Sequence, residues 1–211
     1  MKTEDKLEKE LIGKIAGIFA TLGFLPYLIS VLRGKKPSKA SWILWSVLGI
    51  ALGLSYKSAG ANASIWVPVS YAICPLLILG ATFYKDRSSM EKWPTIDKLS
   101  LWAGLACFIP WIIFKVFEYN GTIFGWLPLI TLYGGIIIDG WGAVPTIIKS
   151  YKDPENESWL GWIFWGIGNV LNLFAIESWD LNISAYVIYM VIPSLLIIPP
   201  VSVYNLRKFF S

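Results

Sequence analysis

The stretch GGIIIDGWGAVPTIIKSYKDPENESWLGWIFW, residues 134–165, is an apolar run that contains Asp139 and Pro145, followed by a short charged break and a tryptophan-rich run. Apolar runs of about 20 residues are long enough to cross the ~30 Å hydrocarbon core of a membrane as helices. Lipid penalises both a charge and a backbone group without a hydrogen-bond partner. The stretch therefore predicts membrane helices that face something other than lipid at these two residues.

Composition extends this prediction to the whole chain. Of the 211 residues, 55% are hydrophobic and 15% are charged, and the mean hydropathy is +0.58. A soluble domain carries about 25% charged residues. Seven apolar stretches account for the difference, at about 12–32, 42–57, 65–84, 99–117, 123–148, 159–176 and 183–204. They lack the alternation of a membrane β-barrel, so we predict an all-α polytopic protein with seven transmembrane helices in the cell (inner) membrane.

The distribution of basic residues predicts the orientation. With the N-terminus outside, the inner loops and the C-terminus carry twelve Lys and Arg residues and the outer side carries six. This agrees with the positive-inside rule and predicts an N-out, C-in topology. Residues 1–11 mix acids with lysines and lack a small-residue cleavage site, which is typical of a solvated tail rather than a signal peptide.

Other classes of site and partner find little support in the composition. Cys74 and Cys107 both fall inside predicted spans, and the chain has no His. We therefore predict no disulfide framework, no metal site and no cofactor. The loop lysines of a membrane protein account for the net charge of +4, so no nucleic-acid partner is predicted.

Four segments of the first half match four segments of the second half, in order and at shifts of 118 to 120 residues. The pairs are GFLPYLISVL (23–32) with GAVPTIIKSY (142–151), WILWSVLGIAL (42–52) with WIFWGIGNVLN (162–172), NAS (62–64) with NIS (182–184), and YAICPLLIL (71–79) with YMVIPSLLI (189–197). A three-span unit that recurs after one intervening span keeps its orientation. The repeat therefore predicts a 3+1+3 architecture with parallel repeats.

The repeat also sets the predicted boundaries. They are an N-terminal tail at 1–11, a three-helix bundle at 12–86, a linker with the fourth transmembrane helix at 87–122, a second three-helix bundle at 123–205 and a C-terminal tail at 206–211. A chain with two bundles can enclose a cavity alone, which leaves both a monomer and a homo-oligomer open.

This architecture, with a proline in the first span, a basic loop and a second span bearing Trp and Asn, resembles the SWEET and PQ-loop superfamily of transporters. The PQ dipeptides correspond to Pro26-Tyr27 and Pro145-Thr146, where the glutamine is absent. The resemblance implies transport of a small polar solute by alternating access between the two bundles, with a sugar as the leading candidate. An amino acid is an alternative, as is a vitamin or nucleoside precursor such as nicotinamide riboside, which a related 3+1+3 group moves.

Prolines occupy matching positions in the outer spans of both repeats, namely Pro26, Pro75, Pro145 and Pro193. A proline inside a helix removes one backbone hydrogen bond. The resemblance implies that these four act as hinges, while the alternative is that they only shape a static bundle. Tyr71 and Tyr189 each precede a proline by four residues, and they either line the same cavity or pack with local hydroxyl partners.

Asp139 is the one acid well inside a predicted span, and its counterpart in the first repeat is Ala20. A charged Asp at the bilayer centre costs about 2.5–3.5 kcal/mol, so Asp139 must face a cavity, pair with a donor or be protonated. Some proton-coupled PQ-loop transporters similarly carry an acid before the second proline, which implies solute contact or proton coupling. The alternative is a buried Asp that is hydrogen-bonded to backbone or to Trp141.

Two further pairs of residues are candidates for solute binding. Asn169 and Asn172 are spaced i, i+3 and share one face of the sixth span, where their amides suit hydroxyl or amino groups. Trp45 and Trp165 are repeat-related, and the resemblance associates tryptophans of the second span with stacking on the solute. The alternatives are hydrogen bonds between helices for the asparagines and an interfacial belt for the tryptophans.

An intramembrane enzyme and a seven-helix receptor are the alternatives to a transporter. An intramembrane enzyme usually shows His clusters or paired acids, and a chain with no His and one buried acid predicts no enzyme. A retinal protein needs a lysine in the last span, and 183–204 has none, so only a non-retinal seven-helix receptor stays open. The predicted partners are thus a small-molecule solute and the lipid bilayer.

Overall fold

The computed structural model describes residues 3–34, 39–85, 95–119 and 126–210. Within these residues the chain is helical and has no strand. The α-helices are α1 (Thr3–Leu32), α2 (Lys39–Ser58), α3 (Trp66–Lys85), α4 (Thr95–Tyr119), α5 (Leu127–Lys152), α6 (Trp159–Phe174) and α7 (Leu181–Phe210), and the 3-10 helices are η1 (Ala63–Ile65) and η2 (Pro154–Asn156). Each predicted span falls on one α-helix, which confirms the all-α fold class. The predicted linker residues 87–94 and 120–122 lie outside the described residues.

The helix ends follow local chemistry. α1 and α2 end two residues before Gly34 and Gly60, whose φ angles of +101° and +106° would strain a residue with a side chain. α6 begins after Ser158, whose hydroxyl oxygen accepts a hydrogen bond from the backbone N–H of Gly161 at 3.3 Å. This is an N-cap, which satisfies one of the free donors of the first turn.

α1 begins at Thr3, so residues 3–11 of the predicted N-terminal tail are helical. Ion pairs one turn apart support this part of the helix, with Lys9 Nζ 3.7 Å from Asp5 and Lys14 Nζ 2.8 Å from Glu10. α7 likewise continues through most of the predicted C-terminal tail. Helix periodicity thus extends beyond the apolar runs that set the predicted limits.

Four helical segments are long and apolar enough to cross a membrane, namely Glu4–Leu32, Ala63–Lys85, Leu127–Lys152 and Leu181–Phe210. They belong to α1, α3, α5 and α7. The apolar parts of α4 and α6 are shorter, at Trp102–Phe117 and Trp159–Phe174. By length and composition, the described helices are those of an integral membrane protein.

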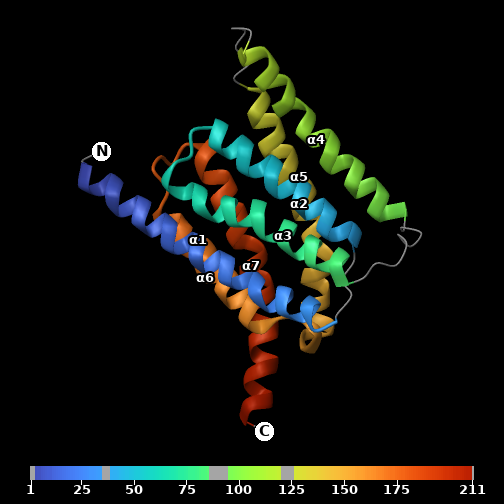
Figure 1. Ribbon diagram of the computed structural model, residues 1–211. Coiled ribbons are helices and arrows are strands. Elements are labelled where there is room, and N and C mark those ends of the chain that lie inside the picture. Colours follow the sequence, from blue (N-terminus) through green and yellow to red (C-terminus); the bar gives the residue numbers. More distant parts are fainter. Residues whose placement is uncertain (1–2, 35–38, 86–94, 120–125, 211) are drawn as a thin grey trace.

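Along the chain, α4 separates two groups of helices, α1–α3 and α5–α7. α3 contacts both α1 and α2, and α7 contacts both α5 and α6. α1 against α6 and α2 against α5 join the groups, while α4 lies on the outside against α5 and α2 (Figure 1). α1 and α7 both run downward in Figure 1, which leaves the N-terminus and the C-terminus at different ends of the bundle.

Small residues bring α1 and α6 together in what we call the small-residue seam, formed by Ala16, Ala20, Gly23, Gly161 and Gly168. Ala16 and Ala20 are fully buried. A Cβ added to Gly168 would lie 2.7 Å from the carbonyl oxygen of Ala16, and one added to Gly23 would lie 2.9 Å from that of Gly161. Residues this small let two helix backbones approach closely.

α2 and α5 meet through a larger side chain. Leu52 of α2 is fully buried, and a Cβ added to Gly135 of α5 would lie 2.6 Å from Leu52 Cδ2. Leu52 belongs to the largest apolar cluster, which also contains Leu48, Tyr56, Leu132, Tyr186, Val187 and Met190. The main core therefore lies between the two groups of helices.

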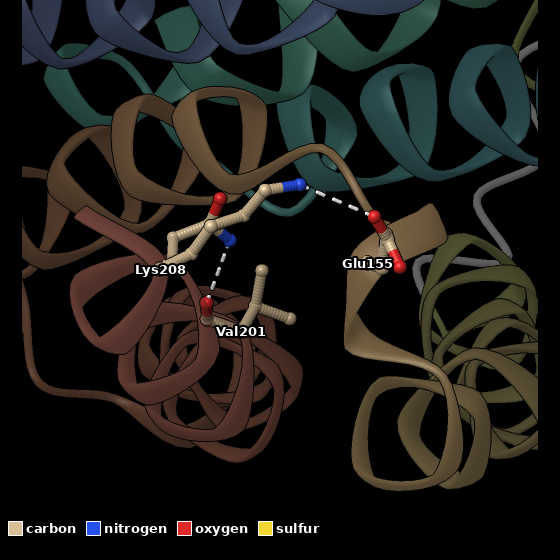
Figure 2. A network of polar contacts seen from close by, with 4 residues as sticks. Glu155, Val201 and Lys208 are labelled. Carbon is tan, nitrogen blue, oxygen red and sulfur yellow. Dashed lines mark hydrogen bonds and ion pairs between the residues drawn. The ribbon is translucent and has the colours of Figure 1, made fainter. Parts of the chain in front are cut away.

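A surface contact ties the end of α7 to η2. Lys208 Nζ lies 3.2 Å from Glu155 Oε1, and Figure 2 shows the two side chains reaching toward each other across the gap between these elements. Both side chains are more than half exposed, so this ion pair is expected to contribute little to stability.

Candidate functional site

Asp139 of α5 is buried, with 9% of its surface exposed, and both carboxylate oxygens accept hydrogen bonds from tyrosines. The hydroxyl of Tyr71 in α3 donates to Oδ1 at 2.5 Å, and that of Tyr189 in α7 donates to Oδ2 at 2.6 Å. Both distances lie within the range of hydrogen bonds from a hydroxyl to an oxygen acceptor. Of the environments predicted for Asp139, the structure thus has the one in which the acid is paired with donors. Trp141, the expected alternative partner, is 76% exposed.

The tyrosines reach this carboxylate from repeat-related helices. Tyr71 is buried and Tyr189 is partly buried, and both lie on the central helix of their group. Gly140, directly after Asp139, leaves room for the second tyrosine, since a Cβ there would lie 3.3 Å from Tyr189 Cε2. The two hydroxyls that were predicted either to line one cavity or to bond locally instead meet on one acid.

Trp165 of α6 adds an aromatic wall beside this cluster. Its ring centroid lies 5.9 Å from that of Tyr71 and 5.0 Å from that of Phe24 in α1, the latter edge to face. The candidate site therefore draws side chains from α1, α3, α5, α6 and α7. An aromatic face next to a carboxylate suits a solute with both apolar and hydrogen-bonding parts.

Trp45 of α2 belongs to a different cluster. It packs against Trp42, with ring centroids 5.0 Å apart, and lies beside Val31 and Ile78. Phe24 contacts both this cluster and the one that contains Trp165. Trp165 therefore packs against Tyr71, which holds Asp139, whereas Trp45 is linked to that cluster through Phe24.

Asn169 and Asn172 are both buried on α6, with 0% and 2% of their surfaces exposed. Asn169 Nδ2 donates to the hydroxyl of Ser194 at 3.1 Å, and Asn172 Nδ2 donates to the carbonyl of Ser64 at 3.0 Å. Both amide oxygens lack a hydrogen-bond partner among the described residues. Each asparagine thus makes the hydrogen bond between elements that was expected as the alternative. Its amide oxygen is left without a donor among the described residues, which is unfavourable for a buried acceptor.

The prolines predicted as hinges all lie inside helices. Pro26, Pro75 and Pro193 lie inside α1, α3 and α7, which continue on both sides of them. Pro145 lies within the bounds of α5, and its side chain lies outside the described part. Each one removes a backbone donor within a long apolar helix.

Glu157, in the turn before α6, is a functional candidate that was not predicted. Its Oε2 accepts hydrogen bonds from Tyr27 of α1 at 3.3 Å and from Trp162 of α6 at 3.2 Å. It therefore bridges the two groups of helices at the end opposite the N-terminus. A signal was present in Tyr27, which follows Pro26 in the first span, but nothing local indicated that a loop 130 residues away would face it.

Within the described ranges, no group of three or more His, Cys, Asp or Glu side chains could hold a metal ion. Cys74 and Cys107 are buried free thiols. The chemistry of the site thus rests on one carboxylate, tyrosine hydroxyls, amides and indole rings.

Comparison of the chain with protein-family models, curated proteins and solved structures finds no match. The function of the protein is therefore inferred from its residues and their geometry.

Proposed function

We propose that this protein is a membrane transporter of a small polar solute that works by alternating access between two three-helix bundles, residues 12–86 and 123–205. The bundles form a 3+1+3 parallel repeat of the SWEET and PQ-loop type, with the N-terminus outside and the C-terminus inside the cell membrane. A sugar is the leading candidate for the solute. An amino acid or a vitamin or nucleoside precursor is the alternative.

The pattern of helix contacts supports the repeat. If α1, α2 and α3 correspond to α5, α6 and α7, then α1–α3 corresponds to α5–α7, and α2–α3 to α6–α7. By the same correspondence, the α1–α6 contact matches the contact between α5 and α2. Both members of each pair are in contact, as expected for two equivalent bundles around an axis along the membrane normal.

One observation carries the functional proposal. Asp139 is a buried carboxylate, and it is held by Tyr71 of one bundle and Tyr189 of the other. Intramembrane acids are costly, and they mark solute and proton pathways. Alternating access needs a polar site at the junction of two moving halves, and this acid lies at such a junction.

The neighbouring residues have complementary roles in this proposal. The free oxygens of Asn169 and Asn172 accept hydrogen bonds from hydroxyl or amino groups of the solute. Trp165 offers an aromatic face for the ring or carbon skeleton of the solute. Asp139 exchanges a proton, which couples the solute to a pH gradient.

The test is flux in proteoliposomes that contain the purified protein. Uptake of a radiolabelled sugar, amino acid and nucleoside is measured with and without an inward proton gradient, for wild type and Asp139→Asn. We expect one class to accumulate in response to the gradient and the variant to lose that response. Trp141→Phe is the matched control, because this neighbouring side chain is 76% exposed and should leave flux unchanged.

Two outcomes would contradict the proposal. One is the absence of flux for every class in liposomes that hold folded protein. The other is gradient-driven flux that survives Asp139→Asn, which would remove the acid from the mechanism.

A further inference from the structure

We infer that Tyr71, Asp139 and Tyr189 form a proton-sensitive latch that links the two bundles to bending at Pro75 and Pro193. The inference rests on the proposed function, and it assigns the two tyrosines a role as positioning residues. They act through Asp139 and not on the solute. We call these three residues the latch.

The latch crosses from one bundle to the other. Tyr71 comes from the first, whereas Asp139 and Tyr189 come from the second. An ionised carboxylate accepts from both hydroxyls, and bonds to a charged acceptor are about twice as strong as neutral ones. A protonated carboxyl has one oxygen that donates, so neither bond stays charge-assisted. Protonation therefore weakens the link between the bundles at their centre.

Each tyrosine is also the residue at which its own helix can bend. A proline leaves the carbonyl oxygen four residues earlier without its helical donor. For Pro75 and Pro193 these carbonyls belong to Tyr71 and Tyr189 themselves. Bending at either proline therefore displaces a tyrosine that holds Asp139, and the latch opposes that bending while its bonds are intact.

The second helix of each bundle in chain order, α2 or α6, lies against the bending point. A Cβ added to Gly49 of α2 would lie 2.2 Å from the carbonyl oxygen of Tyr71, so the backbone of α2 lies directly against the carbonyl that Pro75 frees. Cα–H···O contacts of this kind are weakly favourable. In the second bundle, the position equivalent to Gly49 is Asn169, which bonds Ser194, the residue after Pro193. Both proline sites are thus braced from the same side.

Other titratable groups near the latch are few. α7 contributes Tyr186, whose hydroxyl has no partner among the described residues, and α2 contributes Tyr56, whose ring centroid lies 5.1 Å from that of Tyr186. α4 faces α5 with Cys107, which donates to the carbonyl of Thr131. The charged residues of α2, α3, α4 and α7 lie near the helix ends, and α6 has none. Phenols and thiols stay neutral below about pH 8, so Asp139 is the group that changes charge in the acid range.

The experiment measures the distance between the bundles without any solute. Spin labels are placed at Ser58→Cys on α2 and Leu181→Cys on α7, two exposed positions, in the full-length protein in lipid nanodiscs. Distance distributions are recorded by pulsed electron resonance from about pH 8 to about pH 4, a range that spans the titration of a carboxyl group. The variants are Asp139→Asn, Tyr71→Phe and Tyr189→Phe, with Tyr186→Phe as the control.

The latch predicts that acid shifts the wild-type distribution, and that Asp139→Asn holds the acid distribution at every pH. Tyr71→Phe should move the neutral-pH population ratio about tenfold toward that state, since it removes the bond to a charged group that joins the bundles. Tyr189→Phe removes a bond within the second bundle and should move the ratio less. Tyr186→Phe should follow wild type, because it removes a hydroxyl that makes no described bond.

Three results would overturn the latch. They are a wild-type distribution that ignores pH, a response that persists in Asp139→Asn, and a Tyr71→Phe variant that behaves like Tyr186→Phe. The latch and the proposed function fail separately, because this measurement needs no substrate. Flux without the acid response removes the latch alone, and the acid response without flux removes the transport proposal alone.

Discussion

Under the proposed repeat the α1–α6 contact corresponds to the α2–α5 contact, yet the two are built from different residues. α1 and α6 approach backbone to backbone along the small-residue seam, where Ala20 lies beside Gly168. α2 and α5 meet through Leu52 against Gly135. The counterpart of Ala20 on α5 is Asp139, which turns toward two tyrosines. The close approach of two helix backbones is found at the α1–α6 contact. The buried carboxylate and its tyrosines lie beside the α2–α5 contact.

This difference suggests unequal roles in motion. Backbones in direct contact lose many van der Waals contacts at once when they separate, because packed interiors tolerate little expansion. A single side chain in a notch can slide out at lower cost. We interpret the small-residue seam as the fixed joint between the bundles, and the α2–α5 side, next to the latch, as the side that parts.

The largest expected effect is at the seam. Gly168→Val places a branched side chain where even a Cβ would lie 2.7 Å from the carbonyl oxygen of Ala16. We expect a loss of about 3 kcal/mol in the free energy of unfolding, because neither backbone can move aside. Denaturant titration in detergent micelles measures it. Gly80→Val is the control, since a Cβ there meets nothing within 4 Å, and equal losses in both variants would refute the fixed joint.

A smaller effect is expected on the side that parts. Leu52→Ala removes a fully buried side chain and should lower the free energy of unfolding by about 2 kcal/mol. It should also shift the spin-label distances toward those of separated bundles, because no side chain then fills the space beside Gly135. A loss of stability without any change in that distribution would show that α2–α5 does not part.

The two bundles differ at the matched positions 49 and 169, where the first bundle has Gly49 and the second has Asn169. Asn169→Leu removes one hydrogen bond and one oxygen without a partner. Ser194→Ala removes the same bond but leaves the whole amide unpaired. We expect Ser194→Ala to be more destabilising, by about 1 kcal/mol, while Asn169→Leu reduces solute flux. Thermal unfolding of both variants tests the order, and the reverse order would mean that the oxygen has a structural partner.

The smallest effect concerns pH and the surface contact at Glu155. Hydrogen bonds from Tyr204 and Lys208, together with the charge of Lys208, hold the pKa of Glu155 below its ordinary value. A lowered carboxyl pKa stabilises the folded state above the unfolded pKa of about 4.3. That stabilisation is lost as the pH falls through the lowered folded value.

Glu155→Gln should therefore lower the melting temperature slightly at neutral pH and have no effect in stronger acid. Scanning calorimetry at low salt measures this difference, with Lys208→Gln as the paired variant, which should behave in the same way. A deficit of equal size at acid pH would assign the effect to something other than charge. Neither variant should alter the latch, because this contact lies at the end of α7.

The sequence by itself determined the helices and their order. Apolar runs of membrane length, broken by glycines, prolines and charged loops, are local signals, and each predicted span lies on an observed helix. α1 and α7 extend past the apolar runs that set the predicted limits at the chain ends, because helix formation does not stop where apolar residues stop. The repeat is a further prediction from the sequence, and it rests on the four matched pairs of segments.

Only the tertiary structure decided which side chains meet. Asp139 was predicted to face a cavity, pair with a donor or be protonated, and the donors that it has are two tyrosines 68 and 50 residues away along the chain. Trp165 joined this site and Trp45 did not, although the two hold matching positions. The hydrogen bond between Tyr27 and Glu157 likewise joins residues that are 130 positions apart in the sequence. A hydrogen bond depends on the rotation and depth of each helix relative to its neighbours, and packing across the whole bundle sets these quantities rather than any local run of residues.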